Sequence, residues 1–239
     1  SRSEPYDYFG SRRDGAYAEY VNVPLSNLIK VPKGMDPIAA SLVDPAAIAL
    51  HAIWKADFKA GQSGAVVGCG PIGLFVIQWL RIMGAKDIVA IDIAEEKLAM
   101  ARQAGATHTL LSGASDVELP RCQLVVEAAG HPSSINQAVQ LTKAGGHVVF
   151  IGIPTGEVPI STATFSHFLR QEISLHGAWN SFSAPFPGDE WTASIDKLAS
   201  GELQWQFMIT HDLPLEELPA MFKRYADRSE VAAKVIFRP

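Results

Sequence analysis

The 239-residue chain has the composition of a globular protein, and its charge excludes several kinds of partner. Hydrophobic residues make up 48% of it, enough for a proper core. Its 20 Lys and Arg against 25 Asp and Glu give a formal net charge of -5 without a basic run, so we expect no nucleic-acid partner. No apolar stretch approaches the roughly 20 residues of a membrane span. We therefore expect no membrane anchor and a cytoplasmic location.

Cysteine and histidine usage limits the metal and thiol chemistry that these residues can carry. The two cysteines, Cys69 and Cys122, exclude a disulfide framework and a cysteine-rich structural zinc site within the chain. The seven histidines show no paired metal-ligand spacing. We expect His51, on a predicted apolar helix, to be a buried and hydrogen-bonded residue, and Cys69 to be a small apolar spacer.

The predicted elements, in chain order, describe an α/β protein with flanking pieces. Segments 16–23 and 28–31 show β-like alternation. From 46 to 178, short apolar runs alternate with helical ones, which is typical of βα units and a parallel sheet. The predicted strands are 65–67, 88–91, 124–127, 147–151 and 173–176, with a weak strand at 107–111. The predicted helices are 72–83, 95–104 and 134–141, with Gly84 and Gly105 as C-terminal caps, followed by helical stretches at 195–198 and 215–225 and a last strand at 234–237.

The run Gly68-Cys69-Gly70-Pro71-Ile72-Gly73 lies between an apolar strand and an apolar helix, and it predicts a dinucleotide-binding turn. The first glycine allows the tight turn, the second lets the backbone approach a pyrophosphate, and the third lets helix and strand pack closely. The helix would point its free N–H groups at the phosphates.

Asp92 ends the next predicted strand, about 20 positions past the glycines, where an acidic side chain binds the ribose hydroxyls and repels a 2′-phosphate. We therefore expect NAD rather than NADP. Lys97 is either a surface lysine or a contact beside the adenosine, whereas small residues at the ends of two later strands would let the nicotinamide and its ribose lie against backbone. The expected cofactor-binding residues are Gly68, Gly70, Pro71, Ile72, Gly73, Asp92, Lys97, Ala128, Ala129, Gly130, Ile151, Gly152 and Ile153.

Several separated motifs occur in one order along the whole chain: 14–20 (DGAYAEY), Asp44-Pro45 followed by Leu50-His51-Ala52, the glycine loop, and Lys234-Val235-Ile236. In this combination the chain resembles the medium-chain zinc-dependent alcohol dehydrogenase superfamily. Segments 9–15, 177–179 and 183–188 extend the resemblance to its sugar-alcohol dehydrogenases.

The resemblance implies a Rossmann doubly wound parallel sheet flanked by parts of a GroES-like β catalytic domain. It divides the chain into a remnant of the catalytic domain (1–45), an NAD-binding domain (46–178) and a return to the catalytic domain (179–239). It also implies that on the order of 100 residues, a domain's worth, precede Ser1. The catalytic residues, including the cysteine and Gly-His-Glu motif that hold the zinc, are expected there.

The resemblance further implies a zinc-dependent, NAD-linked oxidation of a secondary hydroxyl, on a polyol or polyol phosphate, to a ketose. This chain would supply mainly the cofactor half and be inactive alone. Two alternatives stay open: a zinc-free quinone or enal reductase of the same superfamily, and a non-catalytic NAD-binding module. A homodimer is expected through the apolar sheet edge at 173–176.

Other candidate site residues each have a simpler interpretation. The resemblance makes Asp44 an additional zinc ligand, but Asp before Pro is also how a helix is capped, which we favour. Arg12 and Arg13 are solvated charges or a phosphate site, since guanidinium groups match phosphate oxygens. Trp179 lines a polyol site or packs between domains.

Overall fold

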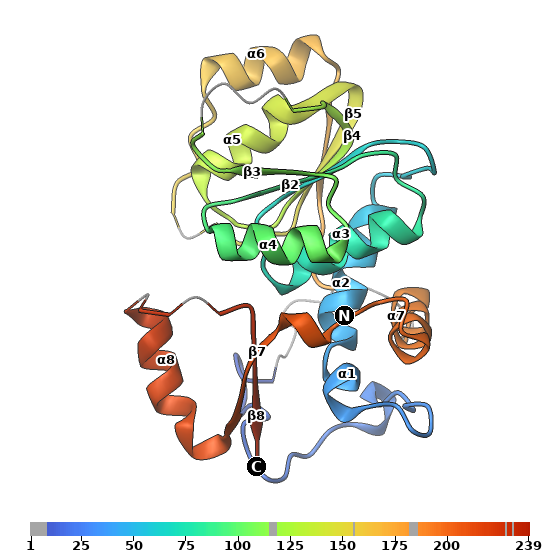
Figure 1. The fold of residues 1–239 in the computed structure, drawn as a ribbon, viewed down its shortest axis with the longest axis vertical. Helices are drawn as coiled ribbons and strands as arrows, with labels where there is room; N and C mark the ends of the chain where they lie inside the picture. Colours follow the sequence, from blue (N-terminus) through green and yellow to red (C-terminus); the bar gives the residue numbers. More distant parts are fainter. Residues whose placement is uncertain (1–8, 115–118, 155, 182–185, 228, 231) are drawn as a thin grey trace.

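A six-stranded parallel sheet organises the upper part of the molecule in Figure 1. The computed structural model describes residues 9–114, 119–154, 156–181, 186–227, 229–230 and 232–239. The strand order is β3-β2-β1-β4-β5-β6, the doubly wound order that the resemblance implied. The strands are β1 (Gly64–Val67), β2 (Ile88–Asp92), β3 (His108–Leu111), β4 (Cys122–Glu127), β5 (Thr142–Phe150) and β6 (Ser174–Gly177).

Helices cover both faces of the sheet, which is why its strands are apolar runs rather than alternating ones. Val66, Ala90 and Val126 belong to one buried cluster with three of the helices, whereas Val125 and Val148 belong to a second cluster on the opposite face. The helices on the first face are α2 (Val43–Trp54), α3 (Pro71–Ile82) and α4 (Glu95–Ala104), and those on the second are α5 (Pro132–Leu141) and α6 (Thr162–Arg170).

The predicted strands and helices between 64 and 177 are present, with shifted ends. Strand β5 begins at Thr142, five residues before the predicted start, because a register shift on β4 between Cys122 and Leu124 lets Thr142 pair with Cys122. Gly105 ends α4 with φ 113°, and Gly84 follows α3 with φ 78°, as helix-ending glycines. Helix α6 was not predicted.

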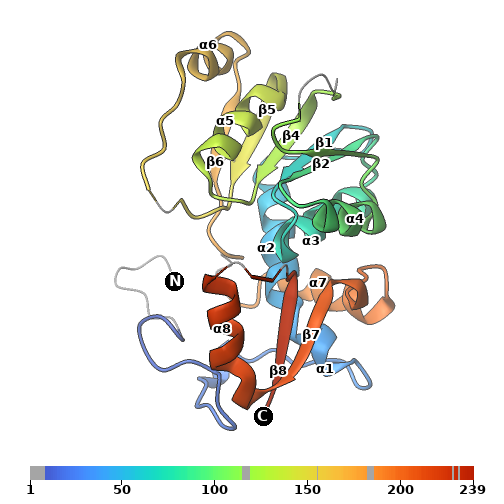
Figure 2. The same cartoon turned by 60° about the vertical axis from the view of Figure 1, so that its left-hand side comes forward.

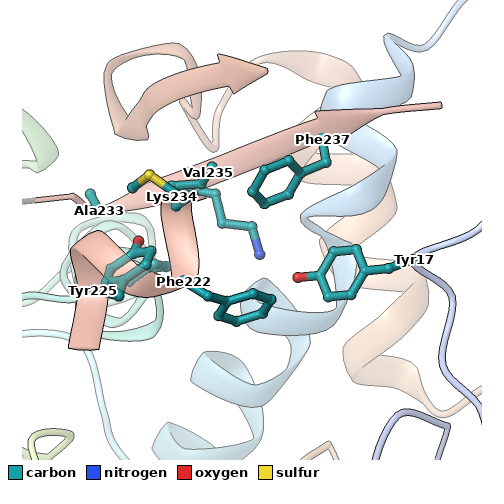
Figure 3. A pocket seen from close by; sticks show the side chains of 9 residues that line it. Tyr17, Phe222, Tyr225, Ala233, Lys234, Val235 and Phe237 are labelled. Atoms are coloured by element: carbon teal, nitrogen blue, oxygen red, sulfur yellow. The ribbon is translucent and has the colours of Figure 1, made fainter. Parts of the chain in front are cut away.

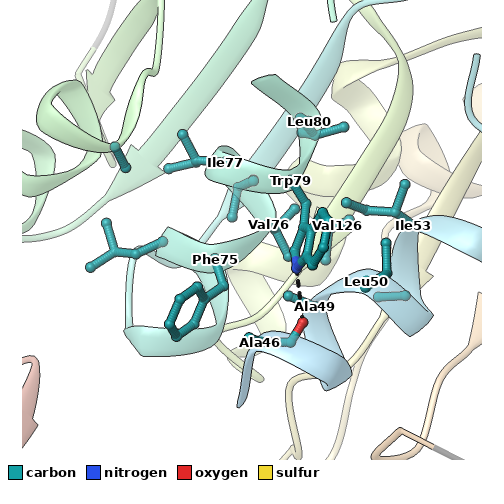
Figure 4. Close-up of a cluster of buried hydrophobic side chains, with 14 of the residues drawn as sticks. Ala46, Ala49, Leu50, Ile53, Phe75, Val76, Ile77, Trp79, Leu80 and Val126 are labelled. Carbon is teal, nitrogen blue, oxygen red and sulfur yellow. Dashed lines mark hydrogen bonds between the residues drawn. The ribbon is translucent and has the colours of Figure 1, made fainter. Parts of the chain in front are cut away.

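The helices α2 and α3 form the centre of the larger core (Figure 4). Eight consecutive residues of α3, from Gly73 to Leu80, are buried. The indole N–H of Trp79 donates to the carbonyl of Ala46 at 3.0 Å, which satisfies a polar atom inside this apolar contact. Helix α3 is therefore fixed on all of its sides.

The lower part of the molecule is built from the two ends of the chain around a second, two-stranded sheet (Figures 1 and 2). His51 of α2 and Glu190 of α7, both buried, join two of its helices through a 2.7 Å contact between Nδ1 and Oε1, which confirms the structural interpretation of His51. The elements are α1 (Pro37–Ser41), α7 (Asp189–Ser200), β7 (Ile209–Pro214), α8 (Leu218–Ala226) and β8 (Lys234–Arg238), with 3-10 turns at Leu25–Asn27, Gln206–Met208 and Leu215–Glu217.

The β-like segments predicted at 16–23 and 28–31 do not form strands, so this prediction is wrong for the described structure. Tyr20 is 90% exposed and Leu25 85% exposed. A strand needs a neighbour for its backbone N–H and C=O groups, and no described segment pairs with these residues. Most of the apolar side chains that alternate along these segments are left exposed in the part of the chain that the structure describes.

The capping interpretation of Asp44 is also wrong. Helix α2 begins at Val43, with Leu42 at the N-cap, so Asp44 lies inside the first turn. The Asp-Pro capping pattern is instead realised one helix earlier, where the Asp36 carboxylate accepts from the N–H of Ile38 at 2.7 Å and Pro37 begins α1. None of the described helices has the length and apolar character needed to cross a membrane.

Two histidines meet across the last strand pair of the sheet. Nδ1 of His147 on β5 lies 2.9 Å from Nε2 of His176 on β6. Burial, the neighbouring His147 and Lys55 all lower the pKa of His176 below its ordinary value of 6.5. The folded protein therefore disfavours protonation of His176.

We predict that this pair makes the fold less stable in mild acid. Because the pKa of His176 is lower in the folded than in the unfolded chain, the unfolded chain binds the proton more tightly, and the free energy of unfolding falls as pH drops through 6.5. Urea unfolding at about pH 7.5 and about pH 5.5 measures this loss. The loss should be smaller in His176→Gln, and an equal loss in both proteins would contradict the prediction.

Candidate cofactor and substrate site

The glycine loop joins β1 to α3, and its three glycines have the geometry that their predicted roles require. Gly68 has φ 101°, and a Cβ there would lie 2.9 Å from the backbone nitrogen of Ala129. A Cβ on Gly73 would lie 2.0 Å from the carbonyl oxygen of Gly68. A Cβ on Gly70 would meet nothing within 4 Å. Two glycines thus close the turn, while Gly70 borders open space.

The start of α3 offers unpaired donors at this open space. Gly70 is the N-cap and has no capping side chain, and Pro71 is the first helical residue. The N–H groups of a helix's first turn have no intrahelical partner and sit at the positive end of its dipole. This arrangement fits the pyrophosphate of a dinucleotide.

Asp92 lies at the end of β2 directly beside the loop and is 7% exposed. One carboxylate oxygen accepts from the N–H of Cys69 at 2.7 Å, and the other accepts from the N–H of Ala94 at 3.0 Å. Burial first, and then the charge of Asp92, raises the pKa of the Cys69 thiol to about 12, so the thiol is protonated and inert as a nucleophile. Asp92 therefore braces the loop backbone.

At the carboxyl edge of the sheet, one further loop packs against the glycine loop, and a second loop packs against the first. Residues 128–130 follow β4, and the N–H of Ala128 donates to the carbonyl of Val67 at 2.8 Å. Residues 151–153 follow β5, and a Cβ on Gly130 (φ 69°) would lie 2.5 Å from the carbonyl oxygen of Ile153. The structure thus brings these three predicted segments together at the edge where parallel sheets bind ligands.

A pocket of about 240 Å³ lies between the start of α3 and the lower sheet. Figure 3 shows the Lys234 side chain extending into it among the rings of Tyr17, Phe222 and Phe237. The pocket is lined by Tyr17, Pro71, Met221, Phe222, Tyr225, Ala233, Lys234, Val235 and Phe237. Lys234 was not among the predicted site residues, although a lysine inside an apolar last strand is a signal that could have indicated it.

Asp44 and Lys234 are electrostatically coupled. Asp44 is exposed as a residue. The atoms packed around its carboxyl group nevertheless raise its pKa, and the positive charge of Lys234 opposes that rise. Burial lowers the pKa of Lys234, and Asp44 opposes that change. The charge of Lys234, which lines a pocket with Pro71, therefore acts on Asp44.

Zinc has no complete site in this part of the chain. Among the described residues, no three His, Cys, Asp or Glu side chains come together in a way that could hold a metal ion. Catalytic zinc sites have three protein ligands, and Asp44 would supply only one of them. The described residues fit a dinucleotide and do not by themselves fit zinc.

The remaining predicted residues lie at the surface. Arg12 and Arg13 are exposed in a turn in which the N–H of Gly10 donates to the carbonyl of Arg13 at 3.0 Å, and the Arg13 guanidinium lies 5.3 Å from the ring centre of Phe9. Trp179, just after β6, is 43% exposed. Lys97 is half-buried in the first turn of α4, near enough for its charge to act on Cys69.

Known proteins resemble the chain over its full length. Galactitol 1-phosphate 5-dehydrogenase of Escherichia coli (strain K12) is 32% identical over 249 residues, covering 100% of this chain and 71% of that protein. The crystal structure of the Escherichia coli galactitol-1-phosphate dehydrogenase superposes with a TM-score of 0.91 at 31% identity, with coverage of 100% and 71%.

Two other similar proteins differ from these in the substrate that the protein is named for or in the cofactor that its structure contains. L-threonine 3-dehydrogenase of Bacillus velezensis is 32% identical over 233 residues, 94% of this chain and 65% of that protein. A zinc-binding dehydrogenase of Sinorhizobium meliloti 1021, whose structure contains NADP, superposes with a TM-score of 0.81 at 29% identity, covering 97% of this chain and 68% of that one.

Residues 71–200, more than half of the chain, match the family described as zinc-binding dehydrogenase. This match begins at Pro71, the first residue of the helix whose N-terminus faces the open space at Gly70. With the full-length similarity to a dehydrogenase and its crystal structure, it confirms the resemblance that the motifs indicated. The chain belongs to the zinc-binding dehydrogenases of the medium-chain alcohol dehydrogenase superfamily.

Proposed function

We propose that this protein is an NAD-linked dehydrogenase that oxidises a secondary hydroxyl of a polyol or polyol phosphate, resembling galactitol 1-phosphate, to a ketose. The observation that carries the cofactor part is the glycine loop, with two glycines that admit no side chain and Gly70 open to solvent at a helix N-terminus. The similarity to galactitol 1-phosphate 5-dehydrogenase supports the substrate class.

Each part of the site has a distinct role toward the dinucleotide. The first turn of α3 and the ammonium group of Lys234, which shares a pocket with Pro71, hold the pyrophosphate. Asp92 accepts from the adenosine ribose hydroxyls, with Lys97 beside it, and the loops 128–130 and 151–153 bind the nicotinamide half. When bound, NAD supplies the hydride acceptor.

Asp44 is proposed as one ligand of a zinc ion whose other ligands, like the catalytic residues, lie in the portion of the relatives that this chain does not match. That portion is 29% of galactitol 1-phosphate 5-dehydrogenase, because the chain covers 71% of it. On this proposal, segments 1–45 and 179–239 belong to a catalytic domain around the NAD-binding domain at 46–178. The 239 residues alone would bind NAD without oxidising a polyol.

A homodimer is proposed through the free edge of the sheet. Strand β6 is the last in the order, and its Leu175 is 40% exposed. Phe165 and Leu169 of the neighbouring helix α6 are 55% and 65% exposed. An apolar strand edge with such neighbours is a template for pairing with another chain.

We predict that the protein binds NADH more tightly than NADPH, because the carboxylate of Asp92 repels a 2′-phosphate. Titration with each nucleotide, followed by the change in nicotinamide fluorescence, measures both dissociation constants. A preference for NADPH would favour a zinc-free reductase of the same superfamily. Binding of NADH without turnover, in a protein extended by the unmatched portion of its relatives, would favour a non-catalytic module.

We predict that alanine at Gly70 weakens cofactor binding, whereas alanine at Gly73 lowers stability. Gly70→Ala should leave the melting temperature unchanged, because its Cβ meets no atom within 4 Å, but should weaken NADH binding by about tenfold or more by filling the phosphate space. Gly73→Ala should lower the melting temperature, because its Cβ would lie 2.0 Å from a carbonyl oxygen. Unchanged NADH affinity in Gly70→Ala would place the pyrophosphate elsewhere.

We predict that Arg12 or Arg13 recognises the phosphate of the substrate. Replacing either with alanine should weaken binding of galactitol 1-phosphate to the NADH-bound protein by about tenfold, the value of one charge-assisted hydrogen bond, and leave binding of galactitol unchanged. Calorimetric titration of both compounds measures the difference. Equal changes for the two compounds, or for L-threonine, would count against phosphate recognition.

A further inference from the structure

Glu127, the last residue of β4, is a completely buried glutamate at the carboxyl edge of the sheet. Its Oε1 accepts three hydrogen bonds, from the N–H of Ala129 at 2.9 Å, the N–H of Gly130 at 2.8 Å and the hydroxyl of Ser134 at 2.6 Å. The side chain therefore folds back under the loop that follows its own strand. Ser134 adds the first turn of α5 to the same acceptor.

The backbone of Glu127 holds the neighbouring loop. Its carbonyl oxygen accepts from the N–H of Ile151 at 3.0 Å and from the N–H of Gly152 at 3.1 Å. One residue thus accepts hydrogen bonds from both loops that flank the nicotinamide half of the proposed site. Among the described residues, no other single residue accepts hydrogen bonds from the backbone of both loops.

The junction between the two loops leaves no room for adjustment. A Cβ on Gly152 would lie 2.2 Å from the backbone nitrogen of Gly130 and 2.7 Å from Oε2 of Glu127. Oε2 is buried and has no hydrogen-bond partner. A buried carboxylate oxygen without a partner is destabilising. Packing alone does not account for a carboxyl group here, because an apolar side chain would fill the space without an unpartnered oxygen. The carboxyl group is accounted for by Oε1, which accepts from three donors.

We propose that Glu127 is the positioning residue of the nicotinamide half of the site. It does not touch the cofactor; it fixes the loops 128–130 and 151–153 against each other, so that their backbone presents one preformed surface to the nicotinamide and its ribose. The inference rests on the proposed NAD binding. It adds that affinity for the two halves of the dinucleotide is controlled separately, by Glu127 on one side and by the glycine loop and Asp92 on the other.

Comparison of NADH with ADP separates these two halves. ADP shares the adenosine and both phosphates with NADH but lacks the nicotinamide and its ribose. Glu127→Ala should weaken NADH binding by about tenfold or more while changing ADP binding by less than about twofold. Glu127→Gln keeps an acceptor at the Oε1 position and should restore most of the NADH affinity.

The controls distinguish positioning from a general loss of stability. Ser134→Ala removes a single donor to Oε1 and should shift the NADH to ADP affinity ratio in the same direction by a smaller factor, which decides the matter if Glu127→Ala does not fold. Glu190→Ala removes another buried glutamate, paired with His51 away from these loops, and should lower the melting temperature without changing the ratio.

An unchanged affinity ratio in Glu127→Ala and Ser134→Ala, with NADH bound normally by the unsubstituted protein, would overturn this inference alone. The same shift of the ratio in Glu190→Ala would also overturn it, because a general loss of stability would then explain the effect. Failure of the unsubstituted protein to bind both NADH and ADP would overturn the proposed function and this inference together.

Discussion

Burial of α3 on every side is the constraint on which the rest of the structure depends. Its apolar residues pack between the sheet and α2, and its polar side chains are used as clamps. Gln78, 1% exposed, donates to the carbonyl of Gln204 at 2.9 Å and accepts from its N–H at 2.7 Å. Arg81 donates to the carbonyl of Glu202 at 3.0 Å. The helix therefore joins the sheet to the C-terminal part of the chain. These contacts and its burial hold its N-terminus in place at the edge of the sheet.

A helix fixed in this way forces the loops at its N-terminus into contact through backbone alone. Gly68 meets residues 128 and 129, and Gly130 meets Ile153, at distances that a Cβ would not tolerate. Such crowding leaves no room for side chains at these two contacts, whereas Gly70 borders open space. Of the three glycines in the loop, Gly70 is thus the one whose backbone stays open to a ligand.

The sheet and the glycine loop could be predicted from the sequence because burial on both faces produces apolar runs, which are local signals. The contacts outside the loop could not, because they join distant residues: Lys234 lines the same pocket as Pro71, and Gln78 donates to the carbonyl of Gln204. Helix α6 was not predicted although Phe165, Phe168 and Leu169 recur at helical spacing, because it has only nine residues and its exposed Phe165 and Leu169 do not belong to the core. The alternation at 16–23 predicted strands whose pairing partner the described residues do not contain.

The hydrogen bonds that Asp92 makes limit how the proposed preference for NAD could change. Both of its oxygens already accept from backbone N–H groups, one of them on Cys69 inside the glycine loop. A neutral side chain would remove the repulsion of a 2′-phosphate but would also weaken the acceptor that shapes the loop, because hydrogen bonds to an ionised carboxylate are about twice as strong as neutral ones. A change in preference toward NADP therefore requires a cation beside an intact Asp92. Ile93, the next residue and 81% exposed, is the position from which a longer basic side chain could supply it.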